Sequence, residues 1–139
     1  MTFIVAERLL GVHRRERWLL VLAGILFFIS YYLPSPLIEG KDTAFTTHMV
    51  GGGVFSGLVW LYACRVKGIS GRAWWWELGT LYVLVCSLGV ANELFEVILY
   101  LAGHMPHGIS DTSWDLVANT FGALCFYAGY KLSRVNWRA

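Results

Sequence analysis

The sequence predicts an all-α membrane protein with four transmembrane helices, and two observations carry that prediction. The composition is apolar, because 57% of the 139 residues are hydrophobic, 16% are aromatic and only 14% are charged, which is too apolar for an ordinary small soluble domain. The apolar residues also form four long blocks, each close to the roughly 20 residues that a helix needs to cross the hydrocarbon core. The expected spans cover about residues 18–33, 43–64, 74–102 and 112–132.

Local signals mark the ends of these blocks. The first block stops at Pro34 and Pro36, which cannot continue a helix. The third block begins with Trp74, Trp75 and Trp76, whose indole rings favour the headgroup level of a bilayer. The first block lacks a small-residue cleavage site and is followed by further apolar blocks, so we expect a retained helix rather than a secretory signal.

The basic residues predict the orientation. All of the 11 lysines and arginines except Lys41 lie before the first block, between the second and third, or at and beyond the end of the fourth. Both termini are therefore expected to be cytoplasmic in a multi-pass protein of the cell membrane. Residues 1–17, MTFIVAERLLGVHRRER, combine an apolar side with a basic one, and we expect a basic amphipathic helix on the anionic inner leaflet. The alternative to this anchoring role is the binding of a partner.

Several function classes find no support. No GxSxG, HExxH, P-loop or Rossmann fingerprint is present, which leaves hydrolase, zincin and nucleotide-binding functions without a motif. No nucleic acid partner is expected. Cys64, Cys86 and Cys125 show no CxxC spacing, so we expect small buried hydrophobic residues rather than disulfides or a thiolate zinc site.

Polar residues gather in the outer halves of the last three blocks, which otherwise resemble the interior of a bilayer. Glu93 and Glu96 fall in the outer half of the third block. His48 lies early in the second block, and Asp115 and Asn119 lie early in the fourth. Since a helix rises about 1.5 Å per residue, these side chains are expected at similar depths on one side of the membrane.

Helical spacing also aligns the polar residues in two stripes. Residues three, four, seven or eight positions apart lie on one face of a helix. Such stripes face a bundle interior or a wet cavity, because an ionised group exposed to lipid costs several kcal/mol. The stripes consist of Asp111, Asp115 and Asn119 in the fourth block and of Glu93, Glu96 and Tyr100 in the third.

The carboxylates need a compensating charge, because like charges this close together repel one another. No lysine or arginine lies in these parts of the spans. The sequence leaves four compensators open: shared protons, a metal ion, a cationic ligand, or a histidine from His48, His104 and His107.

A divalent metal ion is one interpretation of the cluster, and acid–base catalysis is another. An oxygen-rich ligand set suits magnesium, calcium or manganese, although the histidine admits zinc. The candidates for both roles are His48, Glu93, Glu96 and Asp115.

Several candidates also have a purely structural interpretation. Asp111 and Thr112 are well placed to cap the fourth helix, and T-x-x-D from Thr112 to Asp115 resembles a capping box. Asp42 is placed to cap the second helix in the same way. Asn119 is able to serve only as a hydrogen-bonding partner for a neighbouring helix, and a lone histidine is more often a packing residue than a ligand. The mid-span glutamates have the weakest structural explanation.

Small residues predict close helix packing. A second interpretation is that the glycines of HMVGGGVFSGL lower one wall beside His48 and leave room for a headgroup, with Gly52, Asp111, Asn119 and Tyr100 as ligand-binding residues and Trp114 near the mouth. The small residues are Gly51, Gly52, Gly53 and Gly57 in the second block and Ala118, Gly122 and Gly129 in the fourth.

The string GISDTSWDLVANTFGA, preceded by the glutamates of ELFE and by a D-x5-H element that opens the second block, resembles the VanZ-like membrane protein family and its YjdF-type relatives. The similarity covers about residues 40–130, and its best part is the D-x3-N-x2-G element formed by Asp115, Asn119 and Gly122. The resemblance implies a small multi-span protein of the cell envelope.

Three hypotheses follow for the function. The first is a binding module that holds a lipid headgroup, a lipid-linked precursor or a cation. The second is an intramembrane enzyme that acts on an envelope lipid with the carboxylates and the histidine. The third is an assembly subunit that packs against a partner membrane protein. We rank binding slightly above catalysis, with membrane lipids as the expected partners.

Overall fold

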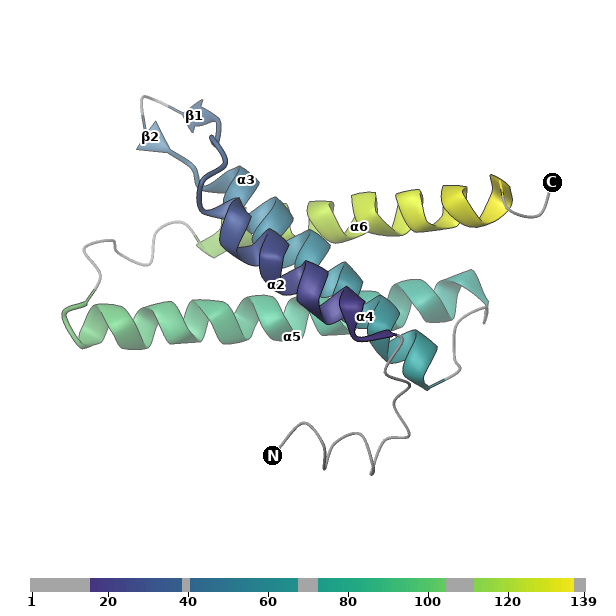
Figure 1. Ribbon diagram of the computed structural model, residues 1–139. Helices are drawn as coiled ribbons and strands as arrows, with labels where there is room; N and C mark the ends of the chain where they lie inside the picture. Colours follow the sequence, from purple (N-terminus) through teal and green to yellow (C-terminus); the bar gives the residue numbers. More distant parts are fainter. Residues whose placement is uncertain (1–15, 39–40, 68–72, 105–111, 137–139) are drawn as a thin grey trace.

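The computed structural model describes residues 16–38, 41–67, 73–104 and 112–136, and the chain is almost entirely helical there (Figure 1). The expected helical fold class is confirmed. Three of the elements, α3, η2 and α4, form one continuous helix over Phe45–Val66. The helices are α2 (Trp18–Ser30), α3 (Phe45–Thr47), the π-helical η2 (His48–Val54), α4 (Phe55–Val66), α5 (Trp74–Leu101) and α6 (Thr112–Asn136).

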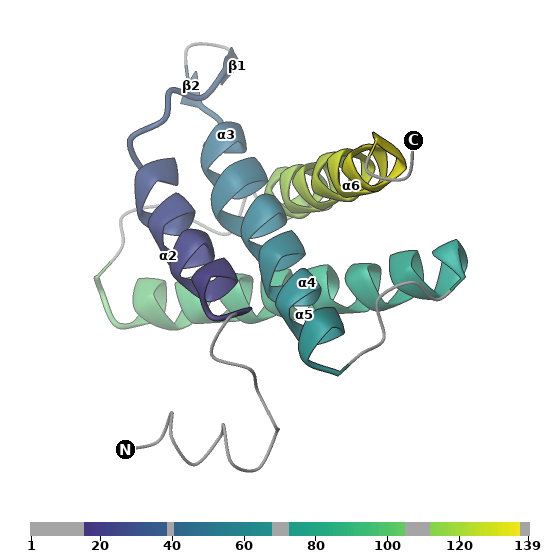
Figure 2. The same cartoon turned by 45° about the vertical axis from the view of Figure 1, so that its right-hand side comes forward.

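The helices form two crossed pairs. α2 lies beside the continuous helix α3–η2–α4, and this pair crosses the pair formed by α5 and α6 (Figures 1 and 2). The ends of α2 and α5 lie at the same end of the molecule as the starts of α3 and α6. We call this the hairpin end. The start of α2 and the ends of α4 and α6 lie at the opposite end, which we call the basic end.

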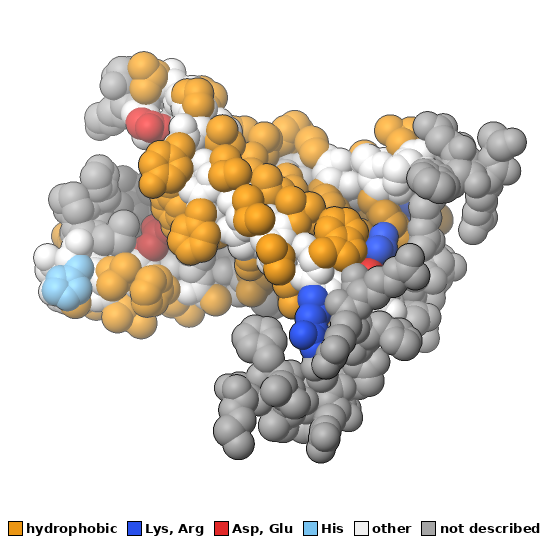
Figure 3. All heavy atoms as spheres, in the orientation of Figure 1, with side chains coloured by type: hydrophobic (Ala, Val, Ile, Leu, Met, Phe, Trp, Pro, Cys, Tyr) orange, Lys and Arg blue, Asp and Glu red, His pale blue; other side chains and the backbone are white. Residues whose placement is uncertain are grey.

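Two of these helices are long and apolar enough to cross a membrane. They are Phe45–Val66 and Trp74–Leu101, with mean hydropathies of 1.4 and 1.7 over their most apolar stretches. Hydrophobic side chains cover most of the visible middle of the molecule, and the described lysines and arginines in that view lie toward the basic end (Figure 3). A four-span topology and the cytoplasmic placement of both termini stay predictions.

The first apolar helix is shorter than the sequence suggests. α2 contains 13 residues, about 20 Å at 1.5 Å per residue, whereas the hydrocarbon core is about 30 Å thick. The helix ends at Ser30, and the amides of Tyr32 and Leu33 bond back only three residues, to Ile29 and Ser30. The residue before Pro34 is disfavoured in the α conformation, so the chain leaves the helix before the expected boundary.

A short β-hairpin, which the sequence pattern does not predict, joins α2 to α3. β1 (Leu37–Ile38) pairs antiparallel with β2 (Lys41–Asp42), with Leu37 opposite Asp42. The Asp42 carboxylate accepts a hydrogen bond from the amide of Ala44 at 2.8 Å. Ala44 is the residue before the helix and has a left-handed φ of 51°. Asp42 therefore stabilises the turn that enters the helix and does not cap the helix directly.

Glycines allow the closest approach between helices, where η2 packs against α6. A Cβ added to Gly53 would collide with the backbone oxygen of Asn119 and lie 2.7 Å from the Cα of Gly122. A Cβ added to Gly122 would collide with the backbone of Met49. Because backbone atoms surround both glycines, either side chain would push the helices apart. The packing interpretation holds for these two glycines, whereas Gly129 has open space around it.

Aromatic residues fill the core toward the basic end. Trp60 of α4 meets Tyr127 and Tyr130 of α6 edge to face, with ring centroids 6.0 and 5.8 Å apart. The indole N–H of Trp60 donates to the Thr80 hydroxyl of α5 at 2.9 Å. A single buried tryptophan therefore joins α4 to both α5 and α6, as an aromatic side chain with a polar group can do.

An ion pair between a buried acid and a half-buried base, not expected from the sequence, joins α5 to α6. Glu77, only 2% exposed, pairs with Lys131 and accepts a hydrogen bond from the Tyr127 hydroxyl at 3.0 Å. The ammonium of Lys131 also lies over the Tyr127 ring, 5.4 Å from its centroid. The available signal was an acid at the start of the third block and a base at the end of the fourth, because these two ends meet when adjacent spans run in opposite directions.

The structure also bears on the expectations for the cysteines and for the N-terminal segment. Cys64 is buried as expected, but Cys86 is only partly buried and Cys125 is exposed, so the expectation of buried cysteines is wrong for Cys125. Residues 1–15 of the expected amphipathic segment lie outside the described residues. Beyond them, Glu16 accepts a hydrogen bond from the Arg65 guanidinium of α4 at 2.9 Å.

The η2–α6 contact predicts opposite effects for two glycine substitutions. Gly53→Ala should lower the free energy of unfolding by about 1–3 kcal/mol, because the added methyl overpacks a backbone contact. Gly79→Ala is the matched control, because a Cβ there meets nothing within 4 Å, and it should be neutral or stabilising by up to about 1 kcal/mol. Thermal unfolding in detergent measures both. Equal effects of the two substitutions would contradict the packing role of Gly53.

The Glu77–Lys131 pair predicts non-additive substitutions. Glu77→Gln or Lys131→Met alone should lower stability by about 1–3 kcal/mol, with the larger loss for Lys131→Met, because that variant leaves the buried Glu77 carboxylate without its cationic partner. The double variant should lose less than the sum of the single losses. A double-mutant cycle of thermal unfolding tests the pair, and strictly additive losses would show that the two side chains act independently.

Candidate functional site

Three of the four residues expected to ligate a metal converge at the hairpin end of the fold. His48 comes from the start of η2, Glu93 from α5 and Asp115 from α6, and one ligand atom of each lies within 4.8 Å of the others. The Nε2 atom of His48 is 3.3 Å from Oδ1 of Asp115. Asp115 is 5% exposed, and the other two side chains are partly buried. Residues from three helices thus form one compact polar group.

The π-helical turn decides where His48 points. η2 begins at His48 and continues to Val54, and its wider i→i+5 turn shifts the side chains before it relative to those of α4. Such turns occur frequently at functional sites. Where the helix returns to α geometry, the Ser56 hydroxyl donates to the backbone oxygen of Gly52 at 2.6 Å. The Gly52 oxygen also accepts a hydrogen bond from the amide of Phe55, so the hydroxyl adds a second bond where the π-helical turn ends.

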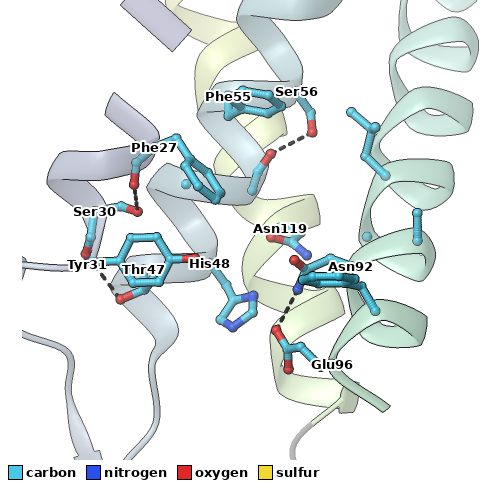
Figure 4. A pocket seen from close by; sticks show the side chains of 16 residues that line it. Phe27, Ser30, Tyr31, Thr47, His48, Phe55, Ser56, Asn92, Glu96 and Asn119 are labelled. Carbon is cyan, nitrogen blue, oxygen red and sulfur yellow. Dashed lines mark hydrogen bonds between the residues drawn. The ribbon is translucent and has the colours of Figure 1, made fainter. Parts of the chain in front are cut away.

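A cavity of about 360 Å³ lies beside this group, between α2, η2, α5 and α6 (Figure 4). Its wall combines aromatic side chains with hydrogen-bonding groups, which is typical of sites for small organic molecules. His48 belongs both to the polar group and to the cavity wall. The polar lining includes Ser30, Thr47, His48, Ser56, Asn92, Glu96 and Asn119, and the aromatic lining consists of Phe27, Tyr31, Phe55 and Phe95.

Glu96 lies in the cavity wall and does not belong to the three-residue group. Its carboxylate accepts a hydrogen bond from the Asn92 amide at 2.7 Å, and the pair lies across the cavity from His48 (Figure 4). Glu93 and Glu96 are three positions apart, so their side chains point about 60° apart around the helix. The expected four-residue ligand set is therefore divided, with Glu93 directed to α6 and Glu96 to the cavity.

Asn119 combines deep burial with a hydrogen-bond acceptor that no donor in the described part of the chain reaches. The side chain is 4% exposed, and its Oδ1 atom has no hydrogen-bond partner there. Asn119 also lines the cavity, as Figure 4 shows. A buried polar atom of this kind calls for a partner such as a ligand, an ion or water.

Neighbouring side chains lie against the glycines beside His48, and the expected role of Gly52 in a ligand site stays a prediction. A Cβ on Gly52 would collide with the side-chain amide of Asn119, and one on Gly51 would collide with the Ser30 hydroxyl. Both glycines line the cavity, but the space that they leave is filled by neighbouring side chains. They therefore make room for the side chains of Ser30 and Asn119 beside the cavity.

The mouth of the cavity differs from the one expected. Tyr100 and Trp114 are exposed and do not line it, whereas three lining residues, Tyr31, Ala91 and Phe95, are exposed. The mouth therefore lies between the end of α2 and the outer part of α5. His104 is exposed beyond the end of α5, and Asp111, His107 and the side chain of Thr112 lie outside the described residues.

The comparisons with known proteins identify a family and no function. Residues 44–134 match a family model described as predicted membrane protein (DUF2238). The chain belongs to the DUF2238 family of predicted membrane proteins. No curated protein and no solved structure matches this DUF2238 protein. The match does not bear on the finer VanZ-like resemblance.

The matched region of the DUF2238 protein contains every member of the polar group. It runs from α3 through η2, α4 and α5 to nearly the end of α6 and includes His48, Glu93 and Asp115 as well as the neighbouring Asn119. It leaves out α2, whose Phe27 and Tyr31 complete the cavity wall. The matched region therefore holds the whole polar group and most of the cavity lining, and only the wall contributed by α2 lies outside it.

Proposed function

We propose that this DUF2238 protein is a four-span protein of the cell envelope that binds the headgroup of a membrane lipid or of a lipid-linked precursor. The observation that carries the proposal is the cavity, which has hydrogen-bonding groups within and aromatic residues at an exposed mouth. An amphiphile matches that division, because its polar part would enter the cavity while its chains stay in the bilayer.

The lining indicates the headgroup chemistry. Glu96 contributes a carboxylate, and Asn92 and Asn119 contribute amides. No lysine or arginine is among the described residues that line the cavity. A headgroup with amine or hydroxyl donors fits these acceptors, because a hydrogen bond to a charged group is among the strongest available.

The orientation is part of the same proposal. The basic end would face the cytoplasm with both termini, since ten of the eleven basic residues lie in the segments expected on that side. Trp74, Trp75 and Trp76 are exposed there, at the level where indole rings favour the interface. The cavity would then lie in the outer half of the bilayer.

Acid–base catalysis on the bound lipid is a second candidate. The observation that favours it is the 3.3 Å separation of His48 and Asp115, because a carboxylate in this position orients an imidazole and stabilises its charged form. His48 also reaches the cavity wall. Binding ranks first, since it requires only the cavity and its polar lining.

Lipid binding predicts two losses and one null effect. Lipids that co-purify with the wild-type protein in mild detergent should be enriched in one headgroup class relative to the membrane. Glu96→Gln should reduce the enrichment roughly tenfold, because a hydrogen bond to a charged group contributes about 1.5 kcal/mol or more. Ala91→Phe should reduce it by filling the mouth. Mass spectrometry of the extracted lipids measures the effect.

Val90→Phe is the matched control for Ala91→Phe, because Val90 is the preceding residue, is exposed and does not line the cavity. It should leave the enrichment unchanged. Bulk lipid composition in the wild type, together with a partner protein that co-purifies in a fixed ratio, would refute lipid binding and support the assembly hypothesis. Gly52→Leu is unsuitable as a space-filling variant, because its side chain would strike Asn119.

The orientation predicts a labelling pattern in intact cells. In a background where the three native cysteines are replaced, Leu37→Cys and His104→Cys should react with an impermeant maleimide, because both positions are exposed at the hairpin end. Lys67→Cys, exposed beyond the end of α4, should react only after permeabilisation. Labelling of Lys67→Cys alone in intact cells would show that the protein has the opposite orientation.

A further inference from the structure

We infer that His48, Glu93 and Asp115 bind a divalent transition-metal ion at the wall of the cavity. First-row metal ions hold histidine nitrogen and carboxylate oxygen at about 2.0–2.2 Å, which places two ligands of one ion roughly 3.0–4.4 Å apart. The 3.3 Å between His48 Nε2 and Asp115 Oδ1 lies within this range. The largest separation in the group, at most 4.8 Å, needs only a small rotation of a side chain to close.

Charge supports the assignment. Two carboxylates that converge within apolar helices are costly unless an opposite charge compensates them. At the basic end, Lys131 pairs with Glu77 and Arg65 with Glu16, so these two cations neutralise acids far from the site. A divalent ion would balance both carboxylates at once and would bind a neutral His48, the form in which histidine ligates metals.

A separate observation points to a ligand at the same place. Asn119 lies one helical turn beyond Asp115 on α6, is buried, and presents an oxygen that no described donor reaches. An amide oxygen of this kind serves either as a further ligand or as an acceptor for a metal-bound water. The burial of Asn119 and its oxygen, unpaired within the described residues, are observed independently of the three ligating residues.

The ligand set indicates the class of metal. One imidazole nitrogen with two carboxylates suits Mn²⁺, Fe²⁺ or Zn²⁺ better than Mg²⁺ or Ca²⁺, which prefer oxygen ligands alone. The four-residue set expected from the sequence favoured the oxygen-binding metals, but Glu96 lies outside the group. Three protein ligands leave a coordination position open, and His48 places the group at the cavity wall.

The inference rests on the proposed function and deepens it, because a metal ion supplies the positive charge that the cavity lining lacks. The phosphate of a lipid headgroup would bind at the ion, while its amine or hydroxyl groups would bind at Glu96 and Asn92 on the opposite wall (Figure 4). The substrate class is therefore a phospholipid or lipid-linked phosphate that carries hydrogen-bond donors.

The test uses the full chain, stripped with a chelator, reloaded with Mn²⁺ or Zn²⁺ and dialysed. Elemental analysis should find about one ion per chain in the wild type and less than about one tenth of that in His48→Ala, Glu93→Gln and Asp115→Asn. Glu96→Gln should keep the full stoichiometry while it loses lipid enrichment. Loss of the ion in Glu96→Gln would overturn the three-residue assignment.

A second measurement does not depend on the folding of any variant. Pulsed electron paramagnetic resonance on the Mn²⁺-loaded wild type should show modulation from a directly bound imidazole nitrogen. Its absence, or failure of the wild type to retain any ion, would overturn the metal site while lipid enrichment could still support the proposed function. An ion bound at full stoichiometry without lipid enrichment would support the metal site and refute the headgroup proposal.

Discussion

The close contact between η2 and α6 is the constraint on which the rest of this structure depends. Gly53 and Gly122 let the two backbones touch, and any side chain at either position would separate the helices. Asp115 lies less than two turns before Gly122 on α6, and His48 opens η2. The approach that the glycines permit therefore also brings the carboxylate within 3.3 Å of the imidazole. Packing and the candidate site are consequences of one contact.

Charged residues form two groups within the fold, one at the basic end and one at the hairpin end. At the basic end, the charges of Glu77 and Lys131 neutralise each other and gain a hydrogen bond from Tyr127, so that this group joins α5 to α6 and is structurally complete. At the hairpin end, two carboxylates share one histidine beside a cavity. Net charge of one sign within apolar helices is costly, which is why the second group, and not the first, is the candidate binding site.

Much of the candidate site could be predicted from two regular features of a helical membrane protein. Helical periodicity decides which residues share a face, and the alternating direction of successive helices decides which residues lie at the same level. The i, i+4 spacing of Asp115 and Asn119 placed both on the buried face of α6, and the matching positions of His48 and Glu93 along their helices brought them to the same level. Cavity residues contributed by α2, such as Phe27, could not be predicted, because nothing in an apolar helix indicates which of its aromatic residues will face a cavity. The Glu77–Lys131 pair was missed, although the opposite directions of the third and fourth blocks bring the acid at the start of one to the base at the end of the other.

The sequence by itself determined that the chain is helical and apolar, where its helices lie within one or a few residues, and which residues form its polar stripes, because hydrophobic length and periodicity are local properties of the chain. Only the tertiary structure decided how those stripes are used. It directed Glu93 to α6 and Glu96 to the cavity, turned His48 through a π-helical segment, and filled the space beside Gly52 with Asn119. These outcomes depend on the angle and distance at which helices meet, and side chains distant in the sequence determine both.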